Sequence, residues 1–172
     1  MNGRKYQEIK TKKEINFLWK KKKNQEFICS HCQRKVFYDR RIGTTHRNHC
    51  PYCLWSKHVD LNEPGDRKST CHGDMEPIGL TFKKEGQDKY KKDKQGELML
   101  IHQCLKCGKI SINRIAGDDD NRAILEVFEK SKQLNPEKIN GLTQTGIKAL
   151  TEQDKQEIET QLFGKNFSFK KP

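Results

Sequence analysis

Long apolar runs are missing from this 172-residue sequence, in which apolar residues make up only 32% and aromatic residues 8%. No stretch approaches the roughly 20 consecutive apolar residues that a membrane-spanning helix needs. Residues 1–13 are polar, whereas a secretory signal peptide carries an apolar core. We therefore expect a protein that stays in the cytoplasm, has no membrane partner and builds only a small hydrophobic core.

Disulfide bonds are not expected either, although the sequence contains seven cysteines. An odd number of cysteines in a reducing compartment, with C-x2-C pairs among them, favours metal ligands over disulfides. Cys29 pairs in this way with Cys32, and Cys50 pairs with Cys53. The spacing of the two pairs is typical of a four-thiolate zinc ribbon, in which each tight turn presents two sulfurs to one ion. These four cysteines are the predicted first zinc site.

A second zinc site is predicted from the remaining cysteines, Cys71, Cys104 and Cys107. Cys104 and Cys107 form a further C-x2-C pair, and the site needs one more ligand. His102 is preferred, because residues two apart on a strand point to the same face. Three alternatives remain open for this ligand, His58, His72 and Asp74, and so does the absence of a second metal. The expected cofactor is thus two Zn²⁺ ions per chain.

Charge is unevenly distributed along the chain, whose formal net charge is +12. The basic excess lies in residues 1–117, whereas residues 118–172 are nearly balanced. Residues 1–26 contain the run Lys20–Lys23 and read as a basic arm that orders on a partner. A lysine run is also commonly a solvated surface, but its position before the first cysteine pair favours contact with a polyanion.

Arginine is concentrated in one part of a chain that otherwise prefers lysine. Five of the eight arginines lie between Cys32 and Cys71. Guanidinium binds phosphate with two parallel hydrogen bonds and stacks on bases, which ammonium cannot do. Arg47 and Arg67 could instead pair with Asp60, Asp66 or Glu76 inside the domain. The predicted nucleic-acid contacts are Lys20, Lys21, Lys22, Lys23, Arg34, Arg40, Arg41, Arg47, Tyr52 and Trp55.

Short strands and two helices are expected from the patterning. Strands are predicted over 36–38, 57–61, 97–103 and 109–114, with a solvated hairpin tip over 83–95. Apolar residues at helical spacing predict a helix from about 121 to 134. Residues 136–150 read as a linker with at most a short helical turn. A last helix is predicted over 151–162, with Thr151 and Asp154 as a capping box.

One string of residues suggests a family. The sequence Arg47-Asn48-His49-Cys50-Pro51 resembles the string that names the bacterial RNHCP-domain family. The similarity extends over about residues 27–128 and includes the stretches 64–67, 75–78, 100–108 and 113–119. The resemblance implies a small cytosolic zinc-ribbon-like domain, flanked by the arm and by a helical extension over 129–172. In the family pattern the position of His72 is usually small, which again favours His102.

The expected fold class is a small, metal-stapled α+β protein, with two successive zinc-ribbon-like β modules followed by C-terminal helices. The expected function is non-enzymatic RNA binding, with ribosomal RNA and neighbouring ribosomal proteins as partners and no small-molecule substrate. One alternative is a DNA-binding or transcription-associated zinc ribbon, disfavoured because no recognition helix is predicted after the knuckles. A protein-binding zinc scaffold is another.

A metal-dependent nuclease is the alternative from another class. It would use His46, His49 and His58, because histidines can activate water or hold a divalent ion. Two of these histidines are crowded beside Cys50, which leaves little room for a water, an ion and a phosphate together. The acidic run at residues 118–120 is read as a helix N-cap rather than as a magnesium site.

Overall fold

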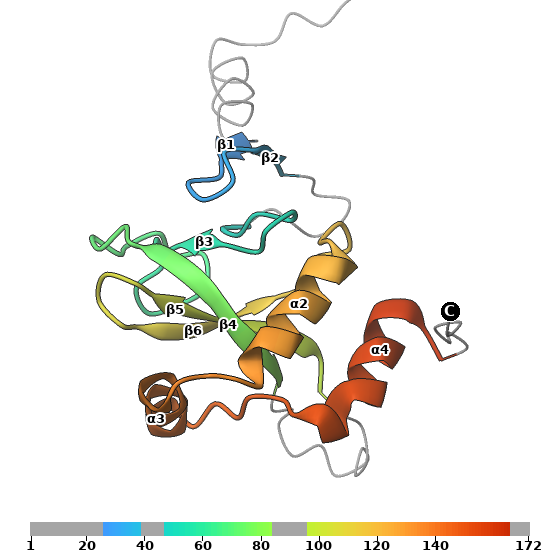
Figure 1. The fold of residues 1–172 in the computed structure, drawn as a ribbon. Helices are drawn as coiled ribbons and strands as arrows, with labels where there is room; N and C mark the ends of the chain where they lie inside the picture. The colour runs from blue at the N-terminus through green and yellow to red at the C-terminus, as the bar shows by residue number, and fades with distance from the viewer. Residues whose placement is uncertain (1–25, 39–46, 84–95, 166–172) are drawn as a thin grey trace, which may run out of the picture.

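The computed structural model describes residues 26–38, 47–83 and 96–165 (Figure 1). A two-stranded antiparallel hairpin comes first, formed by β1 (Glu26–Ile28) and β2 (Lys35–Phe37). A four-stranded antiparallel sheet follows, with its strands in chain order: β3 (Ser56–Lys57), β4 (Asp74–Phe82), β5 (Leu98–Cys104) and β6 (Ile110–Arg114). The helical elements are α2 (Asn121–Ser131), α3 (Pro136–Thr145), the 3-10 turn η2 (Glu152–Asp154) and α4 (Lys155–Phe163).

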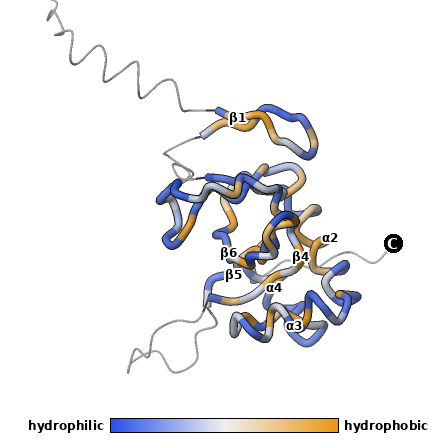
Figure 2. Tube along the Cα trace, turned by 90° about the vertical axis from the view of Figure 1, so that its left-hand side faces the viewer, coloured by the Kyte–Doolittle hydropathy of each residue, from blue (hydrophilic) through white to orange (hydrophobic). Residues whose placement is uncertain are grey.

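Both faces of the four-stranded sheet are covered by helices. Leu80 of β4 and Leu100 of β5 pack with Phe128 of α2 in the larger core cluster, to which α4 also contributes. Ile101 lies one residue further along β5, points to the other face and packs with Leu142 of α3. Figure 2 shows apolar segments concentrated where α2 and α4 lie against the sheet. Within the described residues, no helix has the length and apolar character needed to cross a membrane.

The hairpin β1–β2 lies apart from this core, at one end of the molecule (Figure 1). Its inward-facing residue Val36 is buried, and packs with Cys29, Cys50 and the partly buried Phe27 in a small separate cluster. Such a cluster is too small to hold a hairpin by hydrophobic burial alone. The position of the hairpin therefore depends on the cysteines that surround this cluster.

The expectation of a small α+β protein with C-terminal helices is confirmed, but its details change. Strand β4 was not predicted, because Pro77 and Gly79 interrupt its pattern; they lie at an irregularity of the β4–β5 register. The predicted linker over 136–150 is wrong, because it contains α3, capped by Asn135 and ended by Gly146 in the left-handed region. The predicted strand over 57–61 shortens to the two residues of β3.

The second cysteine set is carried by the four-stranded sheet rather than by a separate ribbon hairpin. The predicted last helix begins as η2, followed by α4, and the predicted capping box of Thr151 and Asp154 is present. The hairpin tip predicted over 83–95 falls almost entirely outside the described residues.

Candidate metal centres

The first candidate centre joins the two predicted C-x2-C turns. Cys29 Sγ lies 3.6 Å from Cys53 Sγ, and Cys32 Sγ lies 3.6 Å from Cys50 Sγ. Each turn is closed by a backbone hydrogen bond that returns to its first cysteine: Gln33 N–H donates to Cys29 O, and Leu54 N–H to Cys50 O. Gln33 and Leu54 have φ values of 59° and 62°. The left-handed residue reverses the chain after each pair of sulfurs.

The separations of the four sulfurs fit one tetrahedral ion. Metal–sulfur bonds of about 2.3 Å in a tetrahedron place neighbouring sulfurs ~3.8 Å apart, whereas a disulfide would place them at about 2.05 Å. Burial raises the pKa of the Cys50 thiol to about 11, and it also raises the pKa of Cys53. Thiolates in this setting need a cation beside them, and the four sulfurs could hold a metal ion.

The second candidate centre contains Cys71, Cys104, Cys107 and His58, whose ligand atoms all lie within 4.8 Å of one another. Cys71 Sγ lies 3.7 Å from Cys104 Sγ, and Cys107 Sγ lies 3.2 Å from His58 Nδ1. Cys104 ends β5, and Gly108, with a φ of 75°, completes the turn that brings Cys107 back to it. Three thiolates and one imidazole form an established tetrahedral ligand set.

A glycine makes this close approach possible. A Cβ atom at Gly73 would lie 2.7 Å from Lys106 Cβ, 2.8 Å from Cys104 Sγ and 3.4 Å from Cys71 Sγ. The first two distances are shorter than non-bonded carbon and sulfur atoms tolerate. The backbone at residue 73 therefore packs directly against the sulfurs of the second centre.

The prediction of His102 as the fourth ligand is wrong, and the structure places His58 there. His102 is fully buried: its Nε2 lies 2.6 Å from Leu54 O, and its Nδ1 lies 2.9 Å from Asn113 Nδ2. Both ring nitrogens are thus engaged, and burial lowers the pKa of His102 to about 4. Alternation along β5 does place this ring on the expected face, but there it packs against Leu54, which closes the second cysteine turn.

His58 reaches the cysteines because its backbone pairs with the segment that carries Cys71. His58 N–H donates to Gly73 O at 2.9 Å, and His72 N–H donates to His58 O at 3.2 Å. The chain thereby continues the pairing of β3 beyond the strand itself. His58 Nε2 is buried without a hydrogen-bond partner among the described residues. No spacing signal marked His58 in the sequence, since its contact with the cysteines depends on this long-range pairing.

Arg47 and His49 of the Arg47–Pro51 string form an ion-pair network with an acidic pair before α2. Arg47 donates to Asp118 Oδ2 from its NH1 at 2.8 Å, and to Asp119 Oδ1 from its NH2 at 3.2 Å. His49 Nε2 lies 2.8 Å from Asp119 Oδ2. The Arg47 side chain is 1% exposed and that of Asp119 0%. The hydrogen bonds from Arg47 hold the pKa of Asp118 below its usual range.

Arg47 is therefore not available to phosphate, which corrects its predicted place among the nucleic-acid contacts. Arg47 does form ion pairs inside the domain, as the alternative prediction stated. Its partners are Asp118 and Asp119 rather than Asp60, Asp66 or Glu76. Arg67 does pair with one of those acids, since its Nε lies 3.8 Å from Asp60 Oδ1. The acidic run has two roles: Asp118 and Asp119 accept hydrogen bonds from Arg47, and Asp120 is the N-cap of α2.

Two aromatic contacts lie beside the first centre. The Arg34 guanidinium lies 5.0 Å from the centroid of the Tyr52 ring, which belongs to the second cysteine turn. His31 and Trp55 stack with centroids 4.0 Å apart and an angle of 3° between their planes. Tyr52 is 45% exposed, whereas Trp55 is partly buried. A cation and aromatic rings thus stand next to the first cysteine cluster.

The other predicted contact residues fall outside the described part of the chain: Lys20, Lys21, Lys22, Lys23, Arg40 and Arg41. His46 of the alternative nuclease site also falls outside it. The two described histidines of the proposed nuclease site have different partners. His49 bonds to Asp119, whereas His58 lies in the second cysteine cluster.

A family model for the RNHCP domain matches residues 24–125, more than half of the chain. The chain belongs to the RNHCP domain family. Searches of curated proteins and of solved structures found no match. In this RNHCP chain the residues Arg47 and His49 of the family string thus bond to acidic side chains about 70 positions later, and Cys50 lies in the first cluster.

Proposed function

We propose that both centres hold zinc and that the protein is a non-enzymatic, cytoplasmic RNA-binding protein. Zinc suits the first cluster because four thiolates in a tetrahedron are a ligand set that it prefers. The second cluster also suits zinc, because three thiolates and one imidazole form another of its tetrahedral ligand sets. In each case the metal supplies folding free energy to a segment with little core of its own. Elemental analysis of the purified protein should give two zinc ions per chain.

The exposed pair of Arg34 and Tyr52 is the observation that carries the RNA proposal. Phosphate attracts the guanidinium, and a base can stack on an exposed aromatic ring. The net charge of +12 supplies the long-range attraction that any polyanion-binding protein needs. The proposed partners are ribosomal RNA and the ribosomal proteins around it.

RNA is favoured over DNA because a strand, and not a recognition helix, follows each C-x2-C turn: β2, β3 and β6 respectively. Binding is favoured over cleavage because His49 and His58 are occupied by separate partners, one structural and one in a metal cluster.

Sedimentation of a cell lysate through a sucrose gradient tests this proposal. The protein should travel with ribosomes at low salt, and leave them at high salt or after ribonuclease, because phosphate contacts weaken steeply with salt. The double variant Arg34→Ala/Tyr52→Ala should shift towards the top of the gradient. Arg114→Ala is the matched control, since it removes one positive charge from a side chain that is 68% exposed on the distant edge strand β6.

Binding of the purified protein to ribosomal RNA fragments tests the contribution of Tyr52 directly. Tyr52→Ala should weaken binding to ribosomal RNA fragments by about five- to hundredfold, whereas Tyr52→Phe, which keeps the ring, should bind like the wild type. Association that survives ribonuclease would show that a protein and not RNA holds the complex, and would contradict the proposed RNA binding. Cleavage of RNA that requires a divalent ion would contradict its non-enzymatic part.

A further inference from the structure

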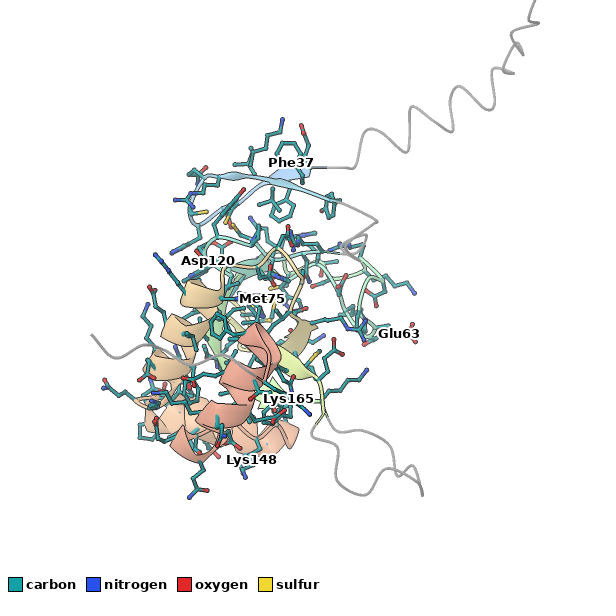
Figure 3. All side chains as sticks on the ribbon, turned by 90° about the vertical axis from the view of Figure 1, so that its right-hand side faces the viewer. Phe37, Glu63, Met75, Asp120, Lys148 and Lys165 are labelled. Atoms are coloured by element: carbon teal, nitrogen blue, oxygen red, sulfur yellow. The ribbon has the colours of Figure 1, made fainter. Side chains whose placement is uncertain are left out.

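The outer face of the hairpin β1–β2 carries an exposed aromatic ring. Strand alternation turns Phe27 and Val36 towards the first cysteine cluster, so that Ile28, Lys35 and Phe37 lie on the opposite face. Phe37 is 58% exposed, and Ile28 on the same face is equally exposed. Figure 3 shows Phe37 on the hairpin, at the end of the molecule far from Lys148 and Lys165.

A cation lies directly beside this ring. Lys35 Nζ is 5.3 Å from the centroid of the Phe37 ring, and 2.8 Å from Glu26 Oε2 on the neighbouring strand. Lys35 and Phe37 are two residues apart on β2, so they share one face of the strand. A nucleotide that stacks on the ring would thus have an ammonium group close to its phosphate.

Two basic runs flank the hairpin in the sequence. In the β1–β2 register Glu26 pairs with Phe37, so the chain enters β1 and leaves β2 at this end. The run Lys20–Lys23 comes shortly before β1, and Arg40 and Arg41 come shortly after β2. In the sequence, these six basic residues thus flank the hairpin, in addition to Lys35 within it.

We propose that Phe37 is a stacking position for an unpaired base, so that the preferred ligand is single-stranded RNA or an unpaired loop. This inference rests on the proposed RNA binding and adds the substrate class to it. Proteins that bind single strands combine a basic path for the backbone with exposed aromatic rings for the bases. Bases inside an RNA duplex are not open to such stacking. A protein partner is disfavoured, because Lys35 lies beside the ring and the sequence on both sides of the hairpin is basic.

Binding of the full-length protein to a short fluorescent oligouridine, measured by fluorescence anisotropy, tests the inference. Phe37→Ala should weaken this binding by about 5- to 150-fold, while Phe37→Tyr should leave it unchanged. Phe37→Leu keeps an apolar side chain without an aromatic face, and should bind as weakly as Phe37→Ala. Ile28→Ala is the matched control, because this side chain is also 58% exposed on the same face and has no ring. Each variant should retain the metal content of the wild type.

A fully paired RNA hairpin of similar length serves as the second ligand. The wild type should bind it more weakly than oligouridine, and Phe37→Ala should not change its affinity. Equal binding of the two RNAs, or wild-type affinity in Phe37→Leu, would overturn the stacking inference. The proposed function would still stand in that case if Tyr52→Ala weakened both complexes. Absence of binding to either RNA would overturn both proposals.

Discussion

Asp119 is the side chain whose removal should destabilise this protein most clearly without touching a cysteine. It is 0% exposed and accepts hydrogen bonds from three groups. These are Arg47 NH2 at 3.2 Å, His49 Nε2 at 2.8 Å and the backbone N–H of Ala116 at 2.8 Å. Asp119→Ala leaves all three groups without this partner in a buried place.

The cost can be estimated from the pairs that are broken. Breaking a buried ion pair by removing one partner costs about 3–5 kcal/mol, because the remaining charge stays buried. Asp118 still holds Arg47 by a bond of 2.8 Å, which favours the lower part of this range. A loss of about 3 kcal/mol is a large fraction of the ~5–15 kcal/mol by which ordinary domains are stable.

Urea unfolding followed by circular dichroism measures this effect, with all variants at the same free metal-ion concentration. Asp118→Ala is the matched control: it also removes a carboxylate from Arg47, but its side chain is 41% exposed, so about 1 kcal/mol or less is expected. If the unfolding free energy of Asp119→Ala lay within about 1 kcal/mol of the wild-type value, the ion pairs of Arg47 and His49 with Asp119 would not stabilise the fold, and this estimate would be wrong.

Three further outcomes follow from the second centre and the C-terminal region. Gly73→Ala should lose one metal ion per chain in elemental analysis, since its Cβ would lie 2.8 Å from Cys104 Sγ, whereas Gly117→Ala, with no atom within 4 Å of its Cβ, should keep both. His58→Cys should retain two metal ions and His58→Ala should bind the second weakly, as competition with a chelator would show. The pKa of Glu152 is lowered by its hydrogen bond from Lys132. This pair therefore stabilises the fold above the unfolded-state pKa of Glu152, and the stabilisation is lost as the pH falls through the lowered, folded-state pKa. Nuclear magnetic resonance titration should show a higher pKa of Glu152 in Lys132→Ala.

The first centre could be predicted from the sequence because its ligands come from local turns. A C-x2-C pair brings two sulfurs together through hydrogen bonds within a few residues, as at Cys29 and Cys50, and needs no knowledge of the fold. The second centre is only partly local. Cys104 and Cys107 share one turn, but Cys71 and His58 meet them through the β4–β5 pairing and the contact of residue 58 with Gly73. Sequence spacing contains no signal for such long-range contacts.

Helix α3 shows a different reason for a missed element. Gly141 lies inside it, where glycine usually weakens a helix, and Leu142 is the only buried residue of the helix. A Cβ at Gly141 would lie 3.1 Å from Ile110 Cδ1, so glycine here permits close packing on β6. The capping residues were nevertheless visible, since Asn135 precedes Pro136 at the N-terminus and Gly146 ends the helix. Capping signals were thus more informative here than apolar spacing.

The Arg47 network also changes which residues can face RNA. Composition alone cannot separate a phosphate-binding arginine from one that is buried against carboxylates, because both are arginines near cysteines and aromatic residues. The partners of Arg47 are Asp118 and Asp119, which lie about 70 positions later in the chain and come close to Arg47 only when α2 docks. Pro51 O accepts the N–H of Asp120 at 2.8 Å, so the same cysteine turn that holds the first centre also fixes the start of α2. Metal binding at the first centre and docking of α2 should therefore stabilise each other, and the proposed RNA contacts no longer include Arg47.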